Sequence, residues 1–90
     1  MDVYYHKSEP AKELAQDILD RAAALGLATR QVQKNNYQVL WDTDMPAVLV
    51  ETGFLTDPTD LANLLDLNHQ KIVARAIADA VLSYLNTHAA

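Results

Sequence analysis

Residues 47–50, Ala-Val-Leu-Val, form an uninterrupted apolar run that ends at the carboxylate of Glu51. A short run rich in β-branched residues predicts a strand buried on both faces, as in α/β sheets that helices cover on each side. In such sheets the site usually lies at the carboxyl ends of central strands, which is where Glu51 stands. Gly53 follows, and a glycine there would let the backbone leave the strand in a conformation that other residues resist. We therefore predict a central strand over residues 47–51.

Two interpretations of Glu51 are open from its position alone. It could act in catalysis, because carboxylates with perturbed chemistry cluster at functional sites. It could instead be a structural acid paired with an arginine such as Arg30, or the first solvated residue beyond the strand. Other catalytic groups are scarce, since the sequence has no cysteine, no Gly-x-Ser-x-Gly motif and only two glycines. Glu51 is therefore the one catalytic candidate, and the sequence shows no partner for it.

The first part of the chain predicts a strand followed by a helix. Residues 2–5 contain Val-Tyr-Tyr, which is typical of a strand. Ser8 can cap the helix, and Pro10 is tolerated in its first turn. Gly26 is a typical residue just beyond a helix C-terminus. We expect this helix over about residues 9–25.

The middle of the chain contains a second candidate strand. Residues 27–36 are polar and predict a connection. Alternate residues over 37–41 are aromatic or β-branched, which suits a strand with one face more buried than the other. The turn at 42–44 is too short for a crossover between parallel strands. The strands at 37–41 and 47–51 are therefore antiparallel neighbours or not neighbours at all.

Two helices are predicted near the end of the sequence. Asp57 is the expected cap of a short helix that ends near Asp66, because Pro58 suits a first helical position. The last helix should begin with Asn68 as its cap and run to about Leu85, since apolar residues repeat there at helical spacing. The residues after it are expected to fray.

These elements predict an α/β fold, a partial open sheet of about three strands with covering helices in the order β-α-β-β-α-α. The final helices should cover one face of the sheet, and the first helix could cover the other. Three short strands are few for a sheet with a buried central strand, so all 90 residues together predict a single partial domain. We expect residues 2–5 to form an unpaired edge strand, which invites self-association or pairing with further strands.

Composition excludes several classes of partner and site. The net charge of −5, from 12 acidic and 7 basic residues, argues against nucleic acid and anionic membranes. The apolar runs are far shorter than the ~20 residues of a membrane span, and no signal peptide is recognisable in this chain. His6, His69 and His88 show no spacing typical of a metal site, so we predict no metal ligand among them.

The central motif resembles that of a known enzyme family. Met-Pro-Ala-Val-Leu-Val-Glu-Thr-Gly-Phe-Leu at residues 45–55 closely resembles the signature of the zinc-dependent N-acetylmuramoyl-L-alanine amidases, the amidase type 3 family of cell-wall hydrolases. Val-Tyr-Tyr at 3–5, the segment 8–19 and Tyr-Gln-Val-Leu at 37–40 are similar to other parts of that family. So is the segment 70–84, and the likeness covers essentially the whole chain.

The resemblance implies a peptidoglycan hydrolase that cleaves the amide between N-acetylmuramic acid and L-alanine, in an extracellular or periplasmic location. In that family two His and one Glu hold a zinc ion that activates water, and the Glu of the central motif is the general base. That general base corresponds to Glu51. The zinc ligands belong to an earlier half of the family's domain, and this sequence resembles the C-terminal half. We therefore expect zinc in the complete domain, none bound by this chain alone, and pairing with the missing N-terminal half.

Two positions depart from the family pattern. Gln31 stands where a glycine is usual after the loop arginine, and Trp41 stands where an arginine is usual. These changes concern the substrate side of the site rather than Glu51. We expect the 90-residue chain alone to be inactive. A competing hypothesis is a non-catalytic module that binds peptidoglycan or an amidase.

Overall fold

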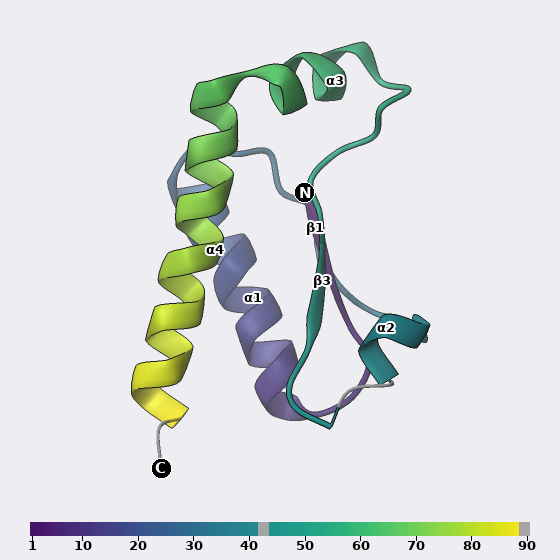
Figure 1. Cartoon of the computed structure of the whole chain (residues 1–90), viewed down its shortest axis with the longest axis vertical. Coiled ribbons are helices and arrows are strands. Elements are labelled where there is room, and N and C mark those ends of the chain that lie inside the picture. The colour runs from purple at the N-terminus through teal and green to yellow at the C-terminus, as the bar shows by residue number, and fades with distance from the viewer. Residues whose placement is uncertain (42–43, 89–90) are drawn as a thin grey trace.

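The protein folds as a small open sheet with helices packed against it (Figure 1). The computed structural model describes residues 1–41 and 44–88. This architecture confirms the α/β class and the open sheet of three strands. The described elements, in chain order, are β1 (Asp2–Tyr5), α1 (Glu9–Ala24), β2 (Val32–Lys34), α2 (Gln38–Trp41), β3 (Val48–Glu51), α3 (Pro58–Leu65) and α4 (Leu67–His88).

The sheet has the strand order β2-β1-β3, so β1 is its central strand. β1 pairs in parallel with β2 and antiparallel with β3. The prediction that residues 2–5 form an unpaired edge open to self-association is therefore wrong, because both edges of β1 are hydrogen-bonded. The prediction of a central, fully buried strand at 47–51 is also wrong. β3 lies at an edge, and all four of its residues are only half-buried.

The segment between α1 and β3 differs most from the prediction. Residues 32–34, expected to be part of a polar connection, form β2, and residues 37–41, expected to be a strand, contain the single helical turn α2. The parallel pairing of β1 and β2 explains this difference, because α1 supplies the long crossover that parallel neighbours need. The predicted turn at 42–44 includes residues outside the described part of the chain.

Helix α1 has the ends that the sequence predicts. The Ser8 hydroxyl accepts a hydrogen bond from the Ala11 N–H at 3.3 Å, and Pro10 lies in the first turn. Beyond the last turn Gly26 adopts a φ of +86°, a left-handed conformation that glycine adopts without strain. The Leu27 N–H then donates to the Ala22 carbonyl, which closes the helix end.

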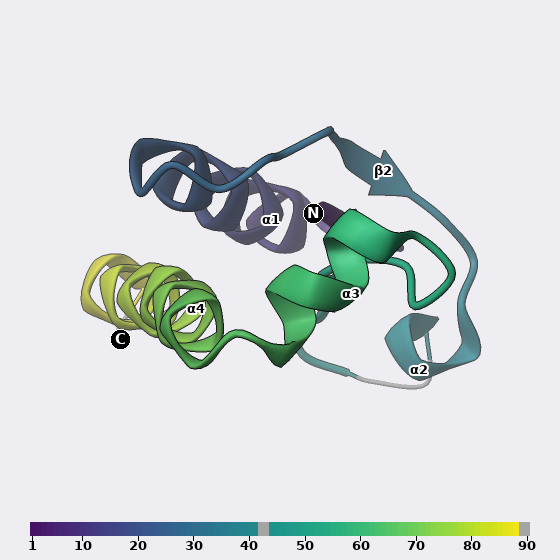
Figure 2. The same cartoon turned by 90° about the horizontal axis from the view of Figure 1, so that it is seen from above.

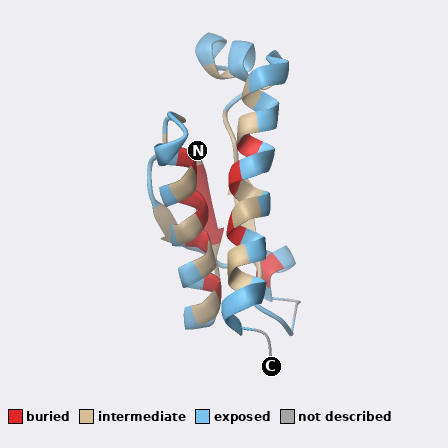
Figure 3. Cartoon of the chain, turned by 90° about the vertical axis from the view of Figure 1, so that its left-hand side faces the viewer, coloured by how far each residue is buried: buried red, intermediate tan, exposed pale blue. Residues whose placement is uncertain are grey.

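Helices α1 and α4 lie side by side on the same face of the sheet (Figure 2). The prediction that the first helix could cover the opposite face is wrong. Small buried residues allow the two helices to approach closely, and buried positions follow their facing sides (Figure 3). α2 lies on the other side of the sheet. The buried residues at the centre of the core are Val3, Ala15, Ile18, Leu19 and Ala80.

The last two helices follow each other almost directly. Asp57 caps α3 as predicted, accepting hydrogen bonds from the N–H groups of Thr59 and Asp60. Asn68 was predicted to cap α4, but Asp66 does so, because its carboxylate accepts from Asn68 N–H at 2.8 Å. α4 continues to residue 88, past the predicted end. None of the described helices is long and apolar enough to cross a membrane.

Candidate functional site

Glu51 is the last residue of β3 and lies opposite Asp2 of β1 in the antiparallel register. Val3, Val48 and Val50 contact the core beneath α1 and α4. Because side chains alternate across a strand, Glu51 and Asp2 lie on the opposite face, together with Tyr4. The fold therefore brings two carboxylates and a tyrosine to one end and one face of the sheet.

Asp2 is the partner of Arg30. Its buried carboxylate lies 3.6 Å from Arg30 Nε and accepts a hydrogen bond from the Gln31 N–H at 3.4 Å. No Lys, Arg or His among the described residues forms an ion pair with Glu51. The hypothesis that Glu51 is the structural partner of Arg30 is therefore wrong, since Asp2 has that role.

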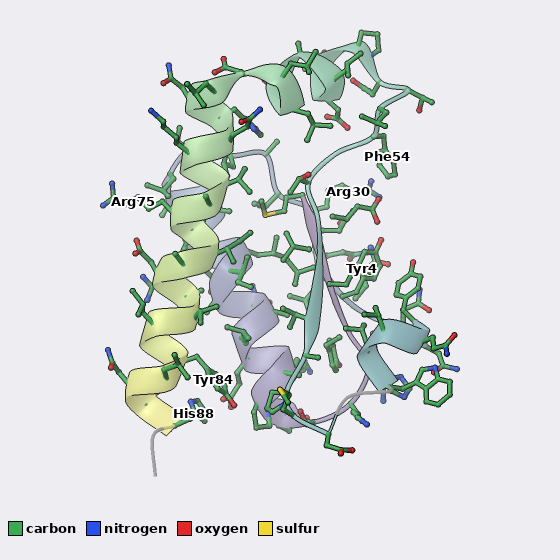
Figure 4. All side chains as sticks on the ribbon, viewed as in Figure 1. Tyr4, Arg30, Phe54, Arg75, Tyr84 and His88 are labelled. Atoms are coloured by element: carbon green, nitrogen blue, oxygen red, sulfur yellow. The ribbon has the colours of Figure 1, made fainter. Side chains whose placement is uncertain are left out.

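The charges of both carboxylates affect the pKa of Tyr4. The residue is only 8% exposed, and its ring meets the Tyr37 ring edge-on, with 5.3 Å between centroids. Burial raises the pKa of Tyr4 above its ordinary value, and the negative charges of Glu51 and Asp2 raise it further. These effects follow because both burial and nearby carboxylates disfavour a phenolate. Figure 4 shows that Tyr4, Arg30 and Phe54 all lie on the side of the sheet away from α4.

The loop after Glu51 is held in place by α3. The Phe54 N–H donates to Asp60 Oδ2 at 2.9 Å, and the Phe54 carbonyl accepts from the Asp57 N–H at 3.1 Å. A Cβ added to Gly53 would lie 3.2 Å from the Asp60 Cβ. Gly53 therefore lets Asp60 approach more closely than a larger residue would without a small shift. Its φ is not in the left-handed region, so the expectation of an unusual backbone conformation there is wrong.

Glu51 lines a hollow of about 230 Å³ between the end of the sheet and the start of α3. Arg30 and Phe54 line it together with Glu51, and both side chains are exposed. In this arrangement the carboxylate can accept a proton, the arginine can bind an anion, and the aromatic ring can pack against an apolar group. The full lining is Met1, Asp2, Ala28, Arg30, Glu51, Gly53, Phe54, Asp57 and Asp60.

The two positions that differ from the amidase pattern lie in different surroundings. Gln31 uses its backbone, donating to Asp2 and accepting from the Val3 N–H at 3.5 Å. Trp41 is 46% exposed at the end of α2, where its carbonyl accepts from Lys7 Nζ at 3.0 Å. Trp41 does not line the hollow at Glu51. Gln31 does not line that hollow either.

The donor set of the described residues does not fit a zinc ion. Catalytic zinc requires three protein ligands, and no three His, Cys, Asp or Glu side chains within residues 1–41 and 44–88 come together in that way. His69 lines a groove between α3 and α4. His88 stacks on Tyr84 with 4.0 Å between ring centroids, at the far end of α4 (Figure 4).

The sequence points to Glu51 as a candidate but not to the residues that surround it in the fold. Asp2 and Tyr4 could have been placed on one face from strand alternation, but their approach to Glu51 depends on the pairing of β1 with β3. Asp60 follows the Asp57 cap by three residues, and this spacing alone gives no sign of its contact with Phe54.

Comparison with known proteins identifies the family to which the chain is similar. The family model described as N-acetylmuramoyl-L-alanine amidase matches residues 1–83. The probable cell wall amidase LytH of Staphylococcus epidermidis is 37% identical over 86 residues, which cover 94% of this chain and 29% of that protein. LytH of Staphylococcus aureus is 37% identical over 87 residues, covering 96% of this chain and 30% of LytH.

Solved structures agree with the family match. The N-acetylmuramoyl-L-alanine amidase of Clostridium difficile 630 superposes with a TM-score of 0.90 at 32% identity, covering 97% of this chain and 48% of that one. The catalytic domain of CwlV from Bacillus (Paenibacillus) polymyxa var. colistinus superposes with a TM-score of 0.84 at 35% identity, covering 94% and 48%. The chain thus spans under a third of these curated relatives and about half of these solved chains.

Proposed function

The chain belongs to the N-acetylmuramoyl-L-alanine amidase family, and from this premise we propose that it is one partial domain of a peptidoglycan amidase with Glu51 as general base. The proposed reaction is hydrolysis of the amide between N-acetylmuramic acid and the L-alanine of the stem peptide. The supporting observation is the position of Glu51, which ends β3 and opens into a hollow beside Arg30 and Phe54. Since relatives are named cell wall amidases, we propose that the protein acts outside the cytoplasmic membrane, at the wall.

The surroundings of Glu51 suit proton transfer. The pairing of β3 with β1 fixes the backbone of Glu51, and the hydrogen bond between Phe54 and Asp60 fixes the loop that follows. Asp2 is occupied by Arg30, whereas Glu51 has no ion-pair partner among the described residues. Its carboxylate is therefore available to take a proton from the attacking water and pass it to the leaving amine.

We propose that the zinc ligands of the complete enzyme come from polypeptide other than the described residues. This follows from the donor set, because no suitable trio of ligands is present among residues 1–41 and 44–88. The 90-residue chain alone should bind no catalytic zinc and release no stem peptide. Stoichiometric zinc in the purified chain, together with hydrolysis of peptidoglycan, would contradict this proposal.

The test is Glu51→Gln in an amidase assembled from this chain and the part of the Clostridium difficile amidase that the chain does not cover. The variant should lower kcat by about 10²–10⁴-fold, because glutamine cannot accept the proton. Its zinc content should stay unchanged. Glu13→Gln is the matched control, since Glu13 is an exposed acid of α1 beside His88 and should not affect kcat. Full activity of Glu51→Gln would exclude a general base role, and loss of zinc would indicate a ligand.

A non-catalytic binding module is the second candidate function. The observation in its favour is the same lack of a metal-binding trio among the described residues. Binding to purified peptidoglycan by the assembled protein, with no release of stem peptide and no effect of Glu51→Gln, would favour this alternative.

A further inference from the structure

A hollow of about 580 Å³ lies between α1 and β2, at the edge of the sheet opposite to β3. β1 and β2 are parallel and α1 connects them, so α1 runs in the opposite direction to β2. The start of α1 therefore lies level with the end of β2, where Lys12 and Lys34 line the hollow. Ala23, near the end of α1, lines the other end together with Arg30. The hollow thus runs along β2 and has basic residues at each end.

The outer edge of β2 offers backbone hydrogen-bonding groups along this hollow. The Asn35 N–H donates to the Tyr5 carbonyl at 2.8 Å, so Asn35 bonds toward β1. Because backbone groups alternate along a strand, those of Val32 and Lys34 point away from β1. Among residues 1–41 and 44–88 these outward groups have no backbone partner. They are therefore available to the amides of a bound peptide.

The end of the hollow at Lys12 and Lys34 carries positive charge that the fold does not neutralise. Neither lysine forms an ion pair with a described residue. The acidic side chain in the lining is Asp20, which accepts a hydrogen bond from Gln16 Nε2 at 2.9 Å. In a chain with a net charge of −5, two such lysines at one end of a hollow indicate a site for a negatively charged group.

Arg30 connects this hollow with the hollow at Glu51, because its side chain lines both. The extended backbone from Arg30 to Lys34 spans about 13 Å, the length of about four residues of a bound peptide. The reaction proposed for Glu51 has a substrate of this kind, since the stem peptide continues beyond the L-alanine whose amide is cleaved. A free peptide chain also ends in a carboxylate, the group that lysines attract.

We propose that the hollow beside β2 binds the part of the stem peptide that lies beyond the L-alanine. This inference rests on the proposed function. The peptide amides bond to the outward backbone groups of Val32 and Lys34, and the terminal carboxylate lies beside Lys12 and Lys34. β2 is three residues long and ends in a lysine, which suits a short charged peptide better than a long strand of another protein.

Peptide binding to the unmodified 90-residue chain is the direct test, because it requires neither zinc nor hydrolysis. The probe is a synthetic stem peptide with a free C-terminal carboxylate. Its addition should shift the amide NMR signals of Val32 and Lys34, whereas those of Val48 and Val50 at the other edge should not move. The same peptide with a C-terminal amide should bind about three- to tenfold more weakly, since it lacks the charge that the lysines attract.

Single substitutions test the two lysines. Lys12→Gln and Lys34→Gln should each weaken binding of the carboxylate peptide by about threefold, because each removes one charge beside the carboxylate. Neither should change binding of the amide peptide by as much. Lys71→Gln is the matched control, since Lys71 is an exposed lysine of α4 that does not line this hollow. Circular dichroism of the three variants establishes that they remain folded.

Kinetics of an amidase assembled from this chain and the uncovered part of the Clostridium difficile amidase give an independent test. Lys34→Gln should raise KM for an N-acetylmuramoyl peptide by about threefold and leave kcat unchanged, because the lysine binds the peptide far from the cleaved bond. With N-acetylmuramoyl-L-alanine, which ends before the hollow, the variant and the unmodified protein should have equal KM values.

Several results would overturn the inference. They are unshifted signals at Val32 and Lys34, equal affinity for the carboxylate and amide peptides, and an unchanged KM in Lys34→Gln. Tighter binding of a glutamate-rich protein segment than of the stem peptide would also overturn it, since the occupant would then be another protein. If the stem peptide binds as expected but Glu51→Gln leaves the assembled protein fully active, the proposed role of Glu51 fails and the peptide site stands.

Discussion

Asp2 and Glu51 are direct partners in the pairing of β1 with β3, and both carboxylates lie on the same face of the sheet. The Asp2 side chain is only 4% exposed and is ion-paired with Arg30, whereas Glu51 has no such partner among the described residues. Like charges directly opposite each other destabilise a strand pair, so Arg30 makes this arrangement tolerable. One carboxylate is paired with the arginine, and the other is the one to which the proposed function assigns proton transfer.

Arg30→Gln should lower the free energy of unfolding by about 1–2 kcal/mol, because it leaves the buried Asp2 carboxylate without its counter-ion. The estimate is modest since the Arg30 side chain is 62% exposed and water screens the pair. Arg75→Gln is the matched control. Arg75 pairs with Asp79 on the exposed side of α4 (Figure 4), and its loss should cost less than about 0.5 kcal/mol. Urea unfolding measures both, and equal losses would contradict a special role for Asp2.

Tyr4 makes stability depend on pH in the alkaline range. Its raised pKa, caused first by burial and then by Glu51 and Asp2, means that the folded state holds the phenolic proton more tightly. The resulting stabilisation is complete below the ordinary pKa of 10.0 and is lost as pH rises through the raised pKa. Tyr4→Phe should remove this part of the alkaline fall in unfolding free energy. Tyr5→Phe, which leaves Tyr4 in place, should retain it, and equal slopes in the two variants would refute the assignment.

The two glycines should respond differently to substitution. Gly26→Ala should cost about 1 kcal/mol through its φ of +86°, and Gly26→Asn should cost less than half of that, because asparagine tolerates the left-handed region. At Gly53 the obstacle is Asp60, 3.2 Å from an added Cβ. Ala and Asn should there cost about 1–3 kcal/mol each, with no advantage for Asn. Thermal unfolding of the four variants checks this, and an Asn advantage at Gly53 would indicate a conformational cause instead.

Asp60 should control the exchange of one amide. Asp60→Ala removes the acceptor of the Phe54 N–H, so that amide should exchange about tenfold faster. Asp60→Asn keeps a side-chain oxygen in nearly the same place and should retain most of the protection. The Asp57 cap, which accepts from Thr59 and Asp60, is unchanged in both variants. If Phe54 exchanges equally fast in all three proteins, Asp60 does not hold the loop.

The helices could be predicted from local chemistry, and the structure confirms three of them. Ser8, Gly26 and Asp57 act on backbone groups a few residues away, so their effects can be read from the sequence. β2 could not be predicted, because its three residues show no usable periodicity and its partner is the distant β1. α2 was assigned as a strand for a related reason, since one helical turn is too short to distinguish the two periods.

The site shows the same division between local and distant effects. The apolar run before Glu51 predicts a strand that ends there, and the structure has that strand. Its position at an edge depends on β1, whose two sides are occupied by segments about 30 and 50 residues away along the chain. The approach of Asp2 and Tyr4 to Glu51 depends on the same pairing. Residue spacing contains no signal for these contacts.

The central position of β1 sets an order of events during synthesis. β1 precedes both of its neighbours along the chain, so it leaves the ribosome before either partner exists. β2 can pair once α1 has formed the crossover, but the second side of β1 stays open until Glu51 has been added. The strand at the middle of this sheet is therefore made before both of its neighbours and is only later bonded on both sides. The nascent chain must keep Val3 and Tyr4 soluble throughout that interval.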